Sequence, residues 1–130
     1  MERVNGSARK LRILVVEDEG LVALLVEDML TDLGHEVAAI VSRMEEAVRV
    51  ARVCSFDFAI VDVNLDGIPS YPVADLLISR SIPFAFATGY GSQGLHSKYA
   101  AVPTLSKPFA SDDLAKLVSE LGTRVNSDLP

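Results

Sequence analysis

Five polar residues of this sequence lie at the ends of four short, mostly apolar runs. They are Glu17, Asp18, Asp62, Thr88 and Lys107. An aspartate beside other carboxylates can hold a divalent cation, and an aspartate can also act as a nucleophile toward a phosphoryl group. A lysine supplies a fixed positive charge, and a threonine supplies a hydroxyl donor. Each residue alone has an ordinary structural explanation, since an aspartate after an apolar run is most often a turn or a helix cap. Their chemistry therefore depends on whether the fold brings them together.

A cluster of these acids requires a cation. Two unit charges about 4 Å apart repel by roughly 4 kcal/mol at an effective dielectric constant near 20. All the available ligand atoms are oxygens, from the carboxylates and from a backbone carbonyl. The two histidines, His35 and His96, are interpreted as surface residues and not as ligands. Such a donor set favours Mg²⁺, or alternatively Mn²⁺, over zinc. The residue types thus predict a magnesium site suited to phosphoryl transfer, in which the metal neutralises charge on the moving group.

Five repeats of a strand followed by a helix must position these residues. Apolar, β-branched runs bounded by turn residues predict the strands. The predicted strands cover residues 11–16, 36–41, 59–61, 83–87 and 102–106. Repeats of this kind imply a parallel sheet with right-handed crossovers and helices on both faces. We therefore predict an α/β, three-layer, flavodoxin-like fold with strand order 2-1-3-4-5, in which the strand ends carrying Glu17, Asp18 and Asp62 are neighbours.

Apolar residues at helical spacing predict the helices between these strands. In the first helix the residues at this spacing are Val22, Leu25, Val26, Met29 and Leu33. The fourth helix is expected to be short, because three glycines between residues 89 and 94 leave only residues 95–100 for it. The last helix is expected to begin near Ser111, which has the residue type of a helix cap, and to end at Gly122.

Composition and charge exclude several classes of function. The chain has 130 residues, of which 49% are hydrophobic, enough for one domain at residues 11–122 between tails at 1–10 and 123–130. The net charge of −6 argues against a nucleic-acid surface. No apolar run reaches the roughly 18 residues that would span a membrane. Cys54 is the only cysteine and no signal peptide precedes residue 11, so we expect a cytoplasmic protein.

The segments that carry the polar residues resemble those of a known family. They are residues 15–19 (VVEDE), 60–65 (IVDVNL), 86–90 (FATGY) and 105–109 (LSKPF). Together, and in this order, they resemble the four signatures of the receiver domain of bacterial two-component response regulators. The resemblance extends over about residues 11–122, and it implies the CheY-like form of the flavodoxin-like fold.

By that resemblance, Asp62 accepts a phosphoryl group from a sensor histidine kinase or a histidine phosphotransfer protein. Asp18, Asp62 and the backbone carbonyl of Asn64 would hold Mg²⁺ directly, and Glu17 would act through water. The protein would catalyse its own phosphorylation and dephosphorylation without being a turnover enzyme on a separate substrate. Its signal would pass to a downstream protein through altered contacts, with no role for nucleic acid or membrane.

The same resemblance assigns the remaining site residues. Thr88 and Lys107 would bind the phosphoryl oxygens, and the Lys107–Pro108 peptide bond would be cis. Residues 83–90 (PFAFATGY) are also similar to the FATGUY subgroup of receivers, whose members are mostly stand-alone proteins.

One position departs from the usual receiver pattern. Most receivers place Tyr or Phe three residues before the lysine, where the ring turns inward on activation, and here that residue is Thr104. We hypothesise that Tyr90 takes over this readout, because it lies two residues after Thr88. The alternative is a tyrosine that simply packs against the shortened fourth helix. Tyr90→Ala is expected to leave phosphorylation intact but to weaken its effect on partner binding.

Two other functions are compatible with parts of the sequence. A haloacid-dehalogenase-like phosphatase also uses an aspartate at a strand end with Mg²⁺. Here, however, Asn64 stands where such a phosphatase has a second acidic residue, and the chain lacks room for a substrate-covering cap. Turnover of a small phosphate ester would favour this enzyme. A pseudo-receiver would bind partners and never take phosphate, although no residue of the site is missing. A DNA-binding output domain is not expected, because only eight residues follow Gly122.

Overall fold

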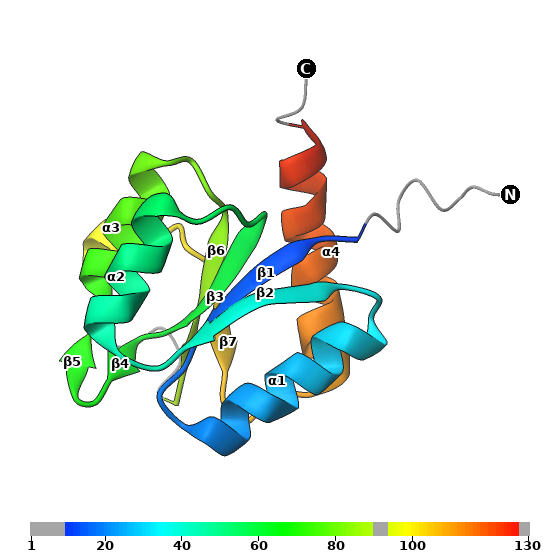
Figure 1. The fold of residues 1–130 in the computed structure, drawn as a ribbon, viewed down its shortest axis with the longest axis horizontal. Helices are drawn as coiled ribbons and strands as arrows, with labels where there is room; N and C mark the ends of the chain where they lie inside the picture. The colour runs from blue at the N-terminus through cyan, green and yellow to red at the C-terminus, as the bar shows by residue number, and fades with distance from the viewer. Residues whose placement is uncertain (1–9, 90–93, 128–130) are drawn as a thin grey trace, which may run out of the picture.

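A parallel sheet of five strands forms the centre of the structure, a computed structural model that describes residues 10–89 and 94–127 (Figure 1). Its strands are β1 (Arg12–Val16), β2 (Glu36–Val41), β3 (Phe58–Asp62), β6 (Phe84–Thr88) and β7 (Thr104–Ser106). Their order across the sheet is β2-β1-β3-β6-β7, and every neighbouring pair is parallel. The predicted order 2-1-3-4-5 and the flavodoxin-like, CheY-like fold are therefore confirmed.

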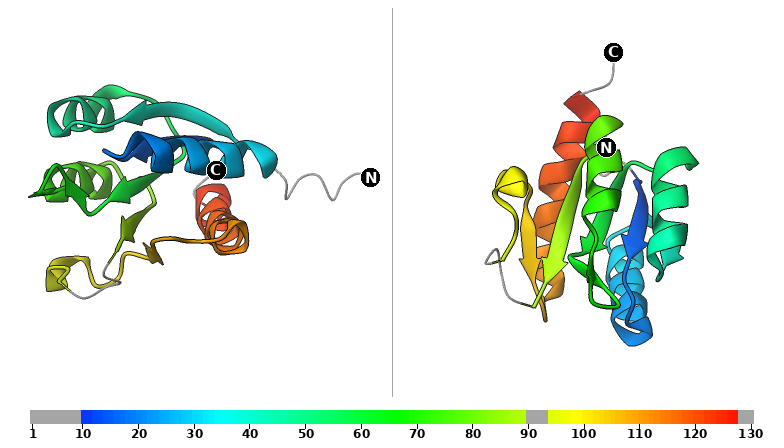
Figure 2. Two further views of the ribbon diagram at one scale, coloured as in Figure 1. Left: turned by 90° about the horizontal axis from the view of Figure 1, so that it is seen from below. Right: turned by 90° about the vertical axis from the view of Figure 1, so that its left-hand side faces the viewer.

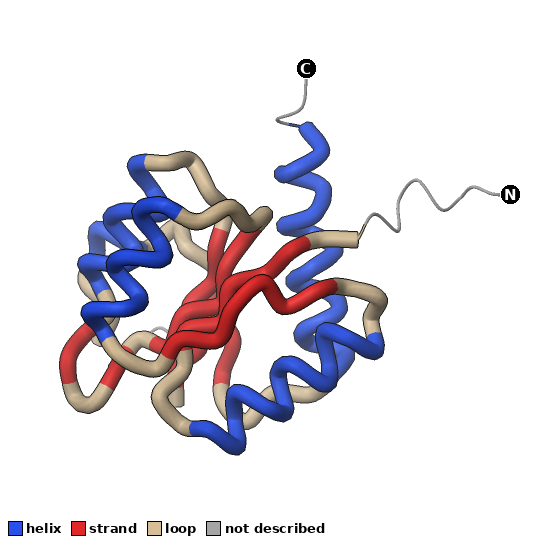
Figure 3. The backbone as a smooth tube through the Cα atoms, in the orientation of Figure 1, coloured by secondary structure: helices blue, strands red, loops and turns tan. Residues whose placement is uncertain are grey.

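Helices cover both faces of this sheet, which gives the three predicted layers (Figures 1, 2 and 3). They are α1 (Gly20–Asp32), α2 (Met44–Val53), α3 (Tyr71–Ser79), α4 (Ser111–Ser127) and the 3₁₀ helix η2 (Ser97–Tyr99). Alternate strand residues point to opposite faces: Ile13 packs with α1 and α4, and Leu14 packs with α2 and α3. Because both faces are buried, the central strands read as unbroken apolar runs.

Within residues 94–103, the described part of the connection from β6 to β7, the fourth helix of the repeat is the single turn of η2, which agrees with the prediction of a shortened helix. Tyr99 in this turn is buried and stacks on Tyr71 of α3, with ring centroids 4.6 Å apart. Its ring also packs nearly perpendicular to the ring of Phe86 on β6. The short turn therefore still covers the sheet beside β6, through aromatic rings rather than a long helical face.

Three expectations need correction or fall outside the described residues. The sequence pattern predicts only a loop between Asp62 and the third helix, but this segment contains the antiparallel hairpin of β4 (Asn64–Leu65) and β5 (Ile68–Pro69). The last helix continues through Gly122 to Ser127, so residues 123–127 of the expected tail are helical. Tyr90, the proposed readout residue, lies outside the described residues. No helix within residues 10–89 and 94–127 is long and apolar enough to cross a bilayer.

Candidate functional site

Two neighbouring strands deliver three acids to one edge of the sheet. β1 is followed directly by Glu17 and Asp18, and β3 ends on Asp62. β1 and β3 are paired, with Val16 opposite Val61, so the acids leave the sheet side by side. One carboxylate oxygen from each of the three acids can be chosen so that all lie within 4.8 Å of one another. The structure therefore brings together the acids that the sequence distributes over separate strands.

Lys107 reaches this cluster from the edge strand β7. Its Nζ lies 2.8 Å from Oε1 of Glu17 and 2.9 Å from Oδ2 of Asp62. Its backbone N–H donates to the carbonyl of Thr88 at 2.8 Å, which fixes the start of the side chain beside β6. The Lys107–Pro108 peptide bond is cis, as expected. One ammonium group thus contacts two of the three acids.

Thr88 is the last residue of β6 and is buried, with 5% of its surface exposed. β6 pairs with β3, and Ala87 stands opposite Asp62. Thr88 therefore emerges from the sheet one residue beyond the level of Asp62, at the same edge as the acids.

The unexpected hairpin is tied to two of the acids. The N–H of Asn64 donates to Oδ1 of Asp62 at 3.2 Å, and the N–H of Asp66 donates to Oδ2 of Asp18 at 2.9 Å. At the base of the hairpin, the hydroxyl of Ser70 donates to the carbonyl oxygen of Asp62 at 2.6 Å. The sequence did not single out Ser70, because a serine just before a helix has the signature of a cap.

Burial and mutual contact shift the pKa values of this cluster. Burial raises the pKa of Glu17 to about 7; the hydrogen bond from Lys107 opposes this rise and the neighbouring Asp62 adds to it. Burial alone would raise the pKa of Asp18, but hydrogen bonds from the N–H of Asp66 and from Glu17 outweigh it, so this pKa lies below its usual value. Burial alone would lower the pKa of Lys107, but its hydrogen bonds to Glu17 and Asp62 raise it above its usual value.

The donor set fits a hard divalent cation. The converging side chains of Glu17, Asp18 and Asp62 offer only carboxylate oxygens, which Mg²⁺ prefers. Three carboxylates face one ammonium group here, so the cluster has capacity for further positive charge. Asp18 is partly exposed and gives this position access to solvent. The magnesium prediction is therefore consistent with the chemistry of the residues present.

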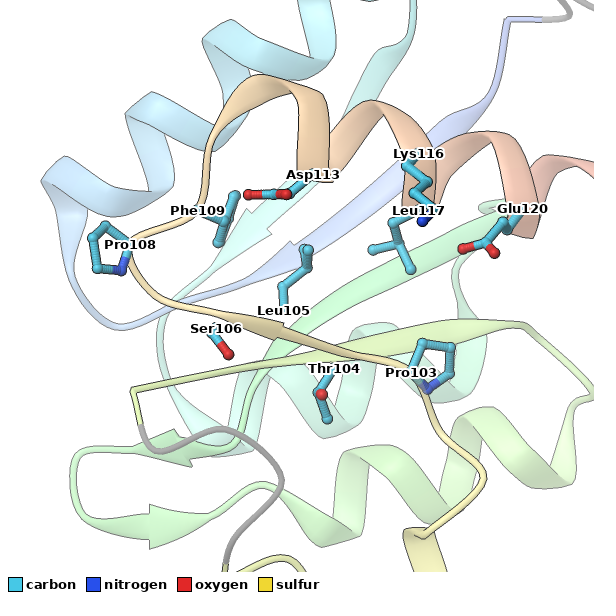
Figure 4. Close-up of a pocket in the computed structure, with 10 residues that line it drawn as sticks. All are labelled: Pro103, Thr104, Leu105, Ser106, Pro108, Phe109, Asp113, Lys116, Leu117 and Glu120. Carbon is cyan, nitrogen blue, oxygen red and sulfur yellow. The ribbon is translucent and has the colours of Figure 1, made fainter.

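A separate groove of about 450 Å³ runs between β7 and α4 (Figure 4). It is lined by Thr104 and Ser106 of β7 and by Lys116 of α4, among others, and by none of the three acids. Thr104 occupies the position where an aromatic residue was expected from the family pattern. This groove at the outer edge of the sheet is therefore distinct from the acidic cluster.

A parallel α/β domain with acids on two adjacent strand ends, and a lysine that reaches them from the edge strand, has the architecture of a receiver domain. Residues 13–119 match the family model of the response regulator receiver domain. The chain therefore belongs to the response regulator receiver domain family of two-component signalling systems.

Individual relatives agree with this assignment. The phyllosphere-induced regulator PhyR of Methylorubrum extorquens is 31% identical over 112 residues, which cover 83% of this chain and 42% of PhyR. The solution structure of SdrG from Sphingomonas melonis Fr1 has 40% identity and a TM-score of 0.77, over 88% of this chain and 97% of SdrG. The receiver domain of the sensor histidine kinase PA1611 from Pseudomonas aeruginosa has 25% identity and a TM-score of 0.77, over 88% of this chain and 99% of that domain, and its structure contains a magnesium ion in the active-site cleft. This chain spans about half the length of the curated relatives it matches.

Proposed function

We propose that this receiver domain accepts a phosphoryl group on Asp62, in a Mg²⁺-dependent transfer from a phosphohistidine of a sensor histidine kinase or a histidine phosphotransfer protein. The observation that carries the proposal is the position of the Asp62 carboxylate. It lies within the cluster of three acids and 2.9 Å from the ammonium group of Lys107. A nucleophile between a cation-binding cluster and a fixed positive charge suits phosphoryl transfer, in which catalysis is mostly positioning and electrostatic stabilisation.

In the proposed transfer, a carboxylate oxygen of Asp62 attacks the phosphorus atom. The phosphorus–nitrogen bond to the donor histidine breaks, and its electron pair stays on the imidazole nitrogen. Asp18, Asp62 and the carbonyl of Asn64 would hold Mg²⁺ directly, with Glu17 acting through water. When bound, Mg²⁺ neutralises charge on the moving group. Lys107 stabilises the phosphoryl oxygens by its charge.

Thr88 would turn the modification into a signal. A phosphoryl group adds about one further negative charge and three acceptor oxygens to Asp62. The hydroxyl of Thr88 donates to one of these oxygens and draws with it the segment that follows β6. Two or three charge-assisted hydrogen bonds contribute roughly 1.5–3 kcal/mol each. Together they supply the roughly 5.5 kcal/mol that changes the ratio of active to inactive protein from 1:99 to 99:1. Tyr90 remains our proposed readout residue, and a downstream protein is the proposed receiver of the signal.

An apolar groove beside Lys107 supports a protein as the phosphodonor. It has a volume of about 240 Å³ and is lined by Val22, Leu25 and Met29 of α1 together with Phe109. The side chain of Leu25 is exposed, although it is apolar. A donor that presents an amphipathic helix could bury this surface while its histidine faces the acidic cluster.

Phosphorylation by acetyl phosphate tests the proposal. Wild-type protein incubated with acetyl phosphate and Mg²⁺ should gain one phosphoryl mass, stable in acid and labile in base, and Asp62→Asn should gain none. Asp66→Asn is the matched control, because it removes an exposed acid of the same segment and keeps the backbone N–H that contacts Asp18. Modification of Asp62→Asn, or failure of the folded wild type to react, would refute the proposal. Turnover of a small phosphate ester would instead favour a phosphatase.

A further inference from the structure

Ser70 has an unusual use of its hydroxyl group. It is completely buried and occupies the N-cap position of α3, yet its side chain makes no capping hydrogen bond with that helix. Its hydroxyl instead donates to the backbone carbonyl of Asp62 at 2.6 Å, within the buried interior. A helix N-cap serine normally satisfies a backbone N–H of its own helix. Here the same group is directed at the strand that carries the phosphoacceptor.

The peptide group between Asp62 and Val63 is thereby held at both ends. Its carbonyl accepts from the Ser70 hydroxyl, and its N–H, which belongs to Val63, donates to the carbonyl of Ala87 on β6 at 3.0 Å. Ser70 also donates its own backbone N–H to the carbonyl of Val63 at 2.8 Å. Two consecutive carbonyls at the end of β3 are therefore fixed by one residue. This peptide group directly follows the Cα atom that carries the Asp62 side chain, and Asn64 lies one residue beyond it.

We propose that Ser70 is a positioning residue, whose hydroxyl fixes the peptide group after Asp62 so that the Asp62 carboxylate and the Asn64 carbonyl converge on one cation position. The effect of Ser70 on phosphoryl transfer rests on the proposed function. Its effect on the local structure does not depend on that function. Without the hydroxyl, the buried carbonyl of Asp62 loses its donor, and the bond from the backbone N–H of Ser70 to the carbonyl of Val63 is the one of the two that remains at the base of the hairpin.

Three variants separate positioning from a general effect on folding. Ser70→Ala removes the hydroxyl, and Ser70→Cys keeps the side-chain size but offers only a weak donor. Ser79→Ala is the matched control, because Ser79 also donates its hydroxyl to a backbone carbonyl, that of Leu76 at 2.9 Å, but on the exposed surface of α3. All measurements are made at a temperature where thermal unfolding shows each variant to be folded.

The first measurement uses the metal-free protein. In both Ser70 variants, the amide hydrogens of Asn64 and Asp66 should exchange with solvent about tenfold faster than in wild type, as expected when a buried hydrogen bond is lost locally. In Ser79→Ala they should exchange at the wild-type rate. Unchanged exchange in the Ser70 variants would overturn the proposal, whether or not the protein is ever phosphorylated.

The second measurement uses Mg²⁺ and acetyl phosphate. The Mg²⁺ concentration that half-saturates the amide chemical shifts should rise about tenfold or more in the Ser70 variants, the usual effect of removing a group that orients a metal ligand. The rate of phosphorylation at saturating Mg²⁺ should also fall. A purely structural role would lower the unfolding temperature but leave both quantities at wild-type values in the folded protein, and that result would refute positioning. If wild type binds Mg²⁺ but is not phosphorylated, the proposed function fails while the Mg²⁺ titration still tests Ser70.

Discussion

Charge balance within the acidic cluster governs the chemistry of its individual residues. Three carboxylates share one ammonium group, and the pKa of Glu17 is raised to about 7 because this side chain is buried next to Asp62. Near neutral pH a proton on Glu17 therefore relieves the excess of negative charge. A divalent cation in the cluster would relieve the same excess, so proton and metal should compete.

This competition predicts that Mg²⁺ binding weakens as the pH falls below about 7. The protonated form of Glu17 dominates there and must lose its proton, so the apparent affinity should fall by up to about tenfold per pH unit. Titrations followed by amide chemical shifts between pH 6 and pH 8 measure this slope. Glu17→Gln should flatten it, whereas Glu19→Gln, at the exposed neighbouring acid, should retain it. Equal slopes in wild type and Glu17→Gln would contradict the assignment.

A second pH effect is predicted at the opposite end of β1, where His35 accepts a hydrogen bond at Nδ1 from the N–H of Leu11, 3.1 Å away. Burial lowers the pKa of His35 in the folded protein, so the unfolded chain binds a proton more readily. The stability that neutral His35 adds to the folded protein is fully present above the ordinary histidine pKa, about 6.5. This stability is lost as the pH falls through the lower pKa of His35 in the folded protein. Urea unfolding at pH 7.5 and pH 5 should show a smaller loss of stability for His35→Asn than for wild type. His96→Asn, at an exposed site, should behave like wild type.

Single residues also show what a sequence can predict about a site. Glu17, Asp18, Asp62, Thr88 and Lys107 could be placed at one edge because each follows an apolar run, and parallel strands end at the same edge. Contacts to backbone atoms could not be predicted in this way, because no residue type or spacing in the sequence marks them. The bond from Ser70 to the Asp62 carbonyl depends on a side-chain rotamer in the folded state, and the residue type alone indicates a helix cap.

Among the elements, the hairpin of β4 and β5 follows β3, which carries Asp62, and contacts Asp18 through the N–H of Asp66. Its turn consists of Asp66 and Gly67, which both have positive φ, at +52° and +81°. Two such residues in succession are required by the type I′ turn of a two-residue hairpin, and Asp-Gly is a preferred pair there. The dipeptide was present in the sequence as a hairpin signal, but the strands on either side are two residues long and carry no alternating pattern.

Gly67→Ala should destabilise the protein by about 1–2 kcal/mol, because a side chain in the left-handed region is strained. Gly20→Ala is the matched control: an added Cβ meets nothing within 4 Å at either position, and Gly20 begins α1 without a positive φ. That substitution should leave stability unchanged or raise it by about 0.5 kcal/mol. Urea unfolding of both variants measures the difference. Equal stabilities would show that the turn tolerates a side chain.

Helix faces and helix ends were less predictable than strand positions. Leu25 and Leu33 share the helical spacing of Val26, yet both are exposed, while Leu30 is fully buried. Apolar residues occur around much of α1, so spacing alone does not decide which stripe faces the sheet. Gly122 was an expected stop, but a glycine inside a helix costs only about 1 kcal/mol, and α4 continues past it.

For the whole molecule, Mg²⁺ binding should couple to global stability. A ligand that binds only the folded state at ten times its dissociation constant adds about 1.4 kcal/mol to the free energy of unfolding. Urea unfolding with and without Mg²⁺, at constant ionic strength, should show this gain in wild type. Asp18→Asn should lose it, and Asp32→Asn, an exposed acid at the end of α1, should keep it. A gain of the same size in Asp18→Asn would place the cation elsewhere.

The stack of Tyr71 on Tyr99, with Phe86 against it, has a practical consequence. The chain contains no tryptophan and only three tyrosines, so its ultraviolet emission comes from a small, known set of rings. Two of them are 4.6 Å apart, and Phe86 lies two residues before Thr88. Tyr99 donates its hydroxyl to Asp75 at 2.7 Å, and burial together with this carboxylate raises its pKa to about 12. In a Tyr90→Phe variant, intrinsic fluorescence would therefore come only from Tyr71 and Tyr99, and it would report on the aromatic group beside β6 without any label.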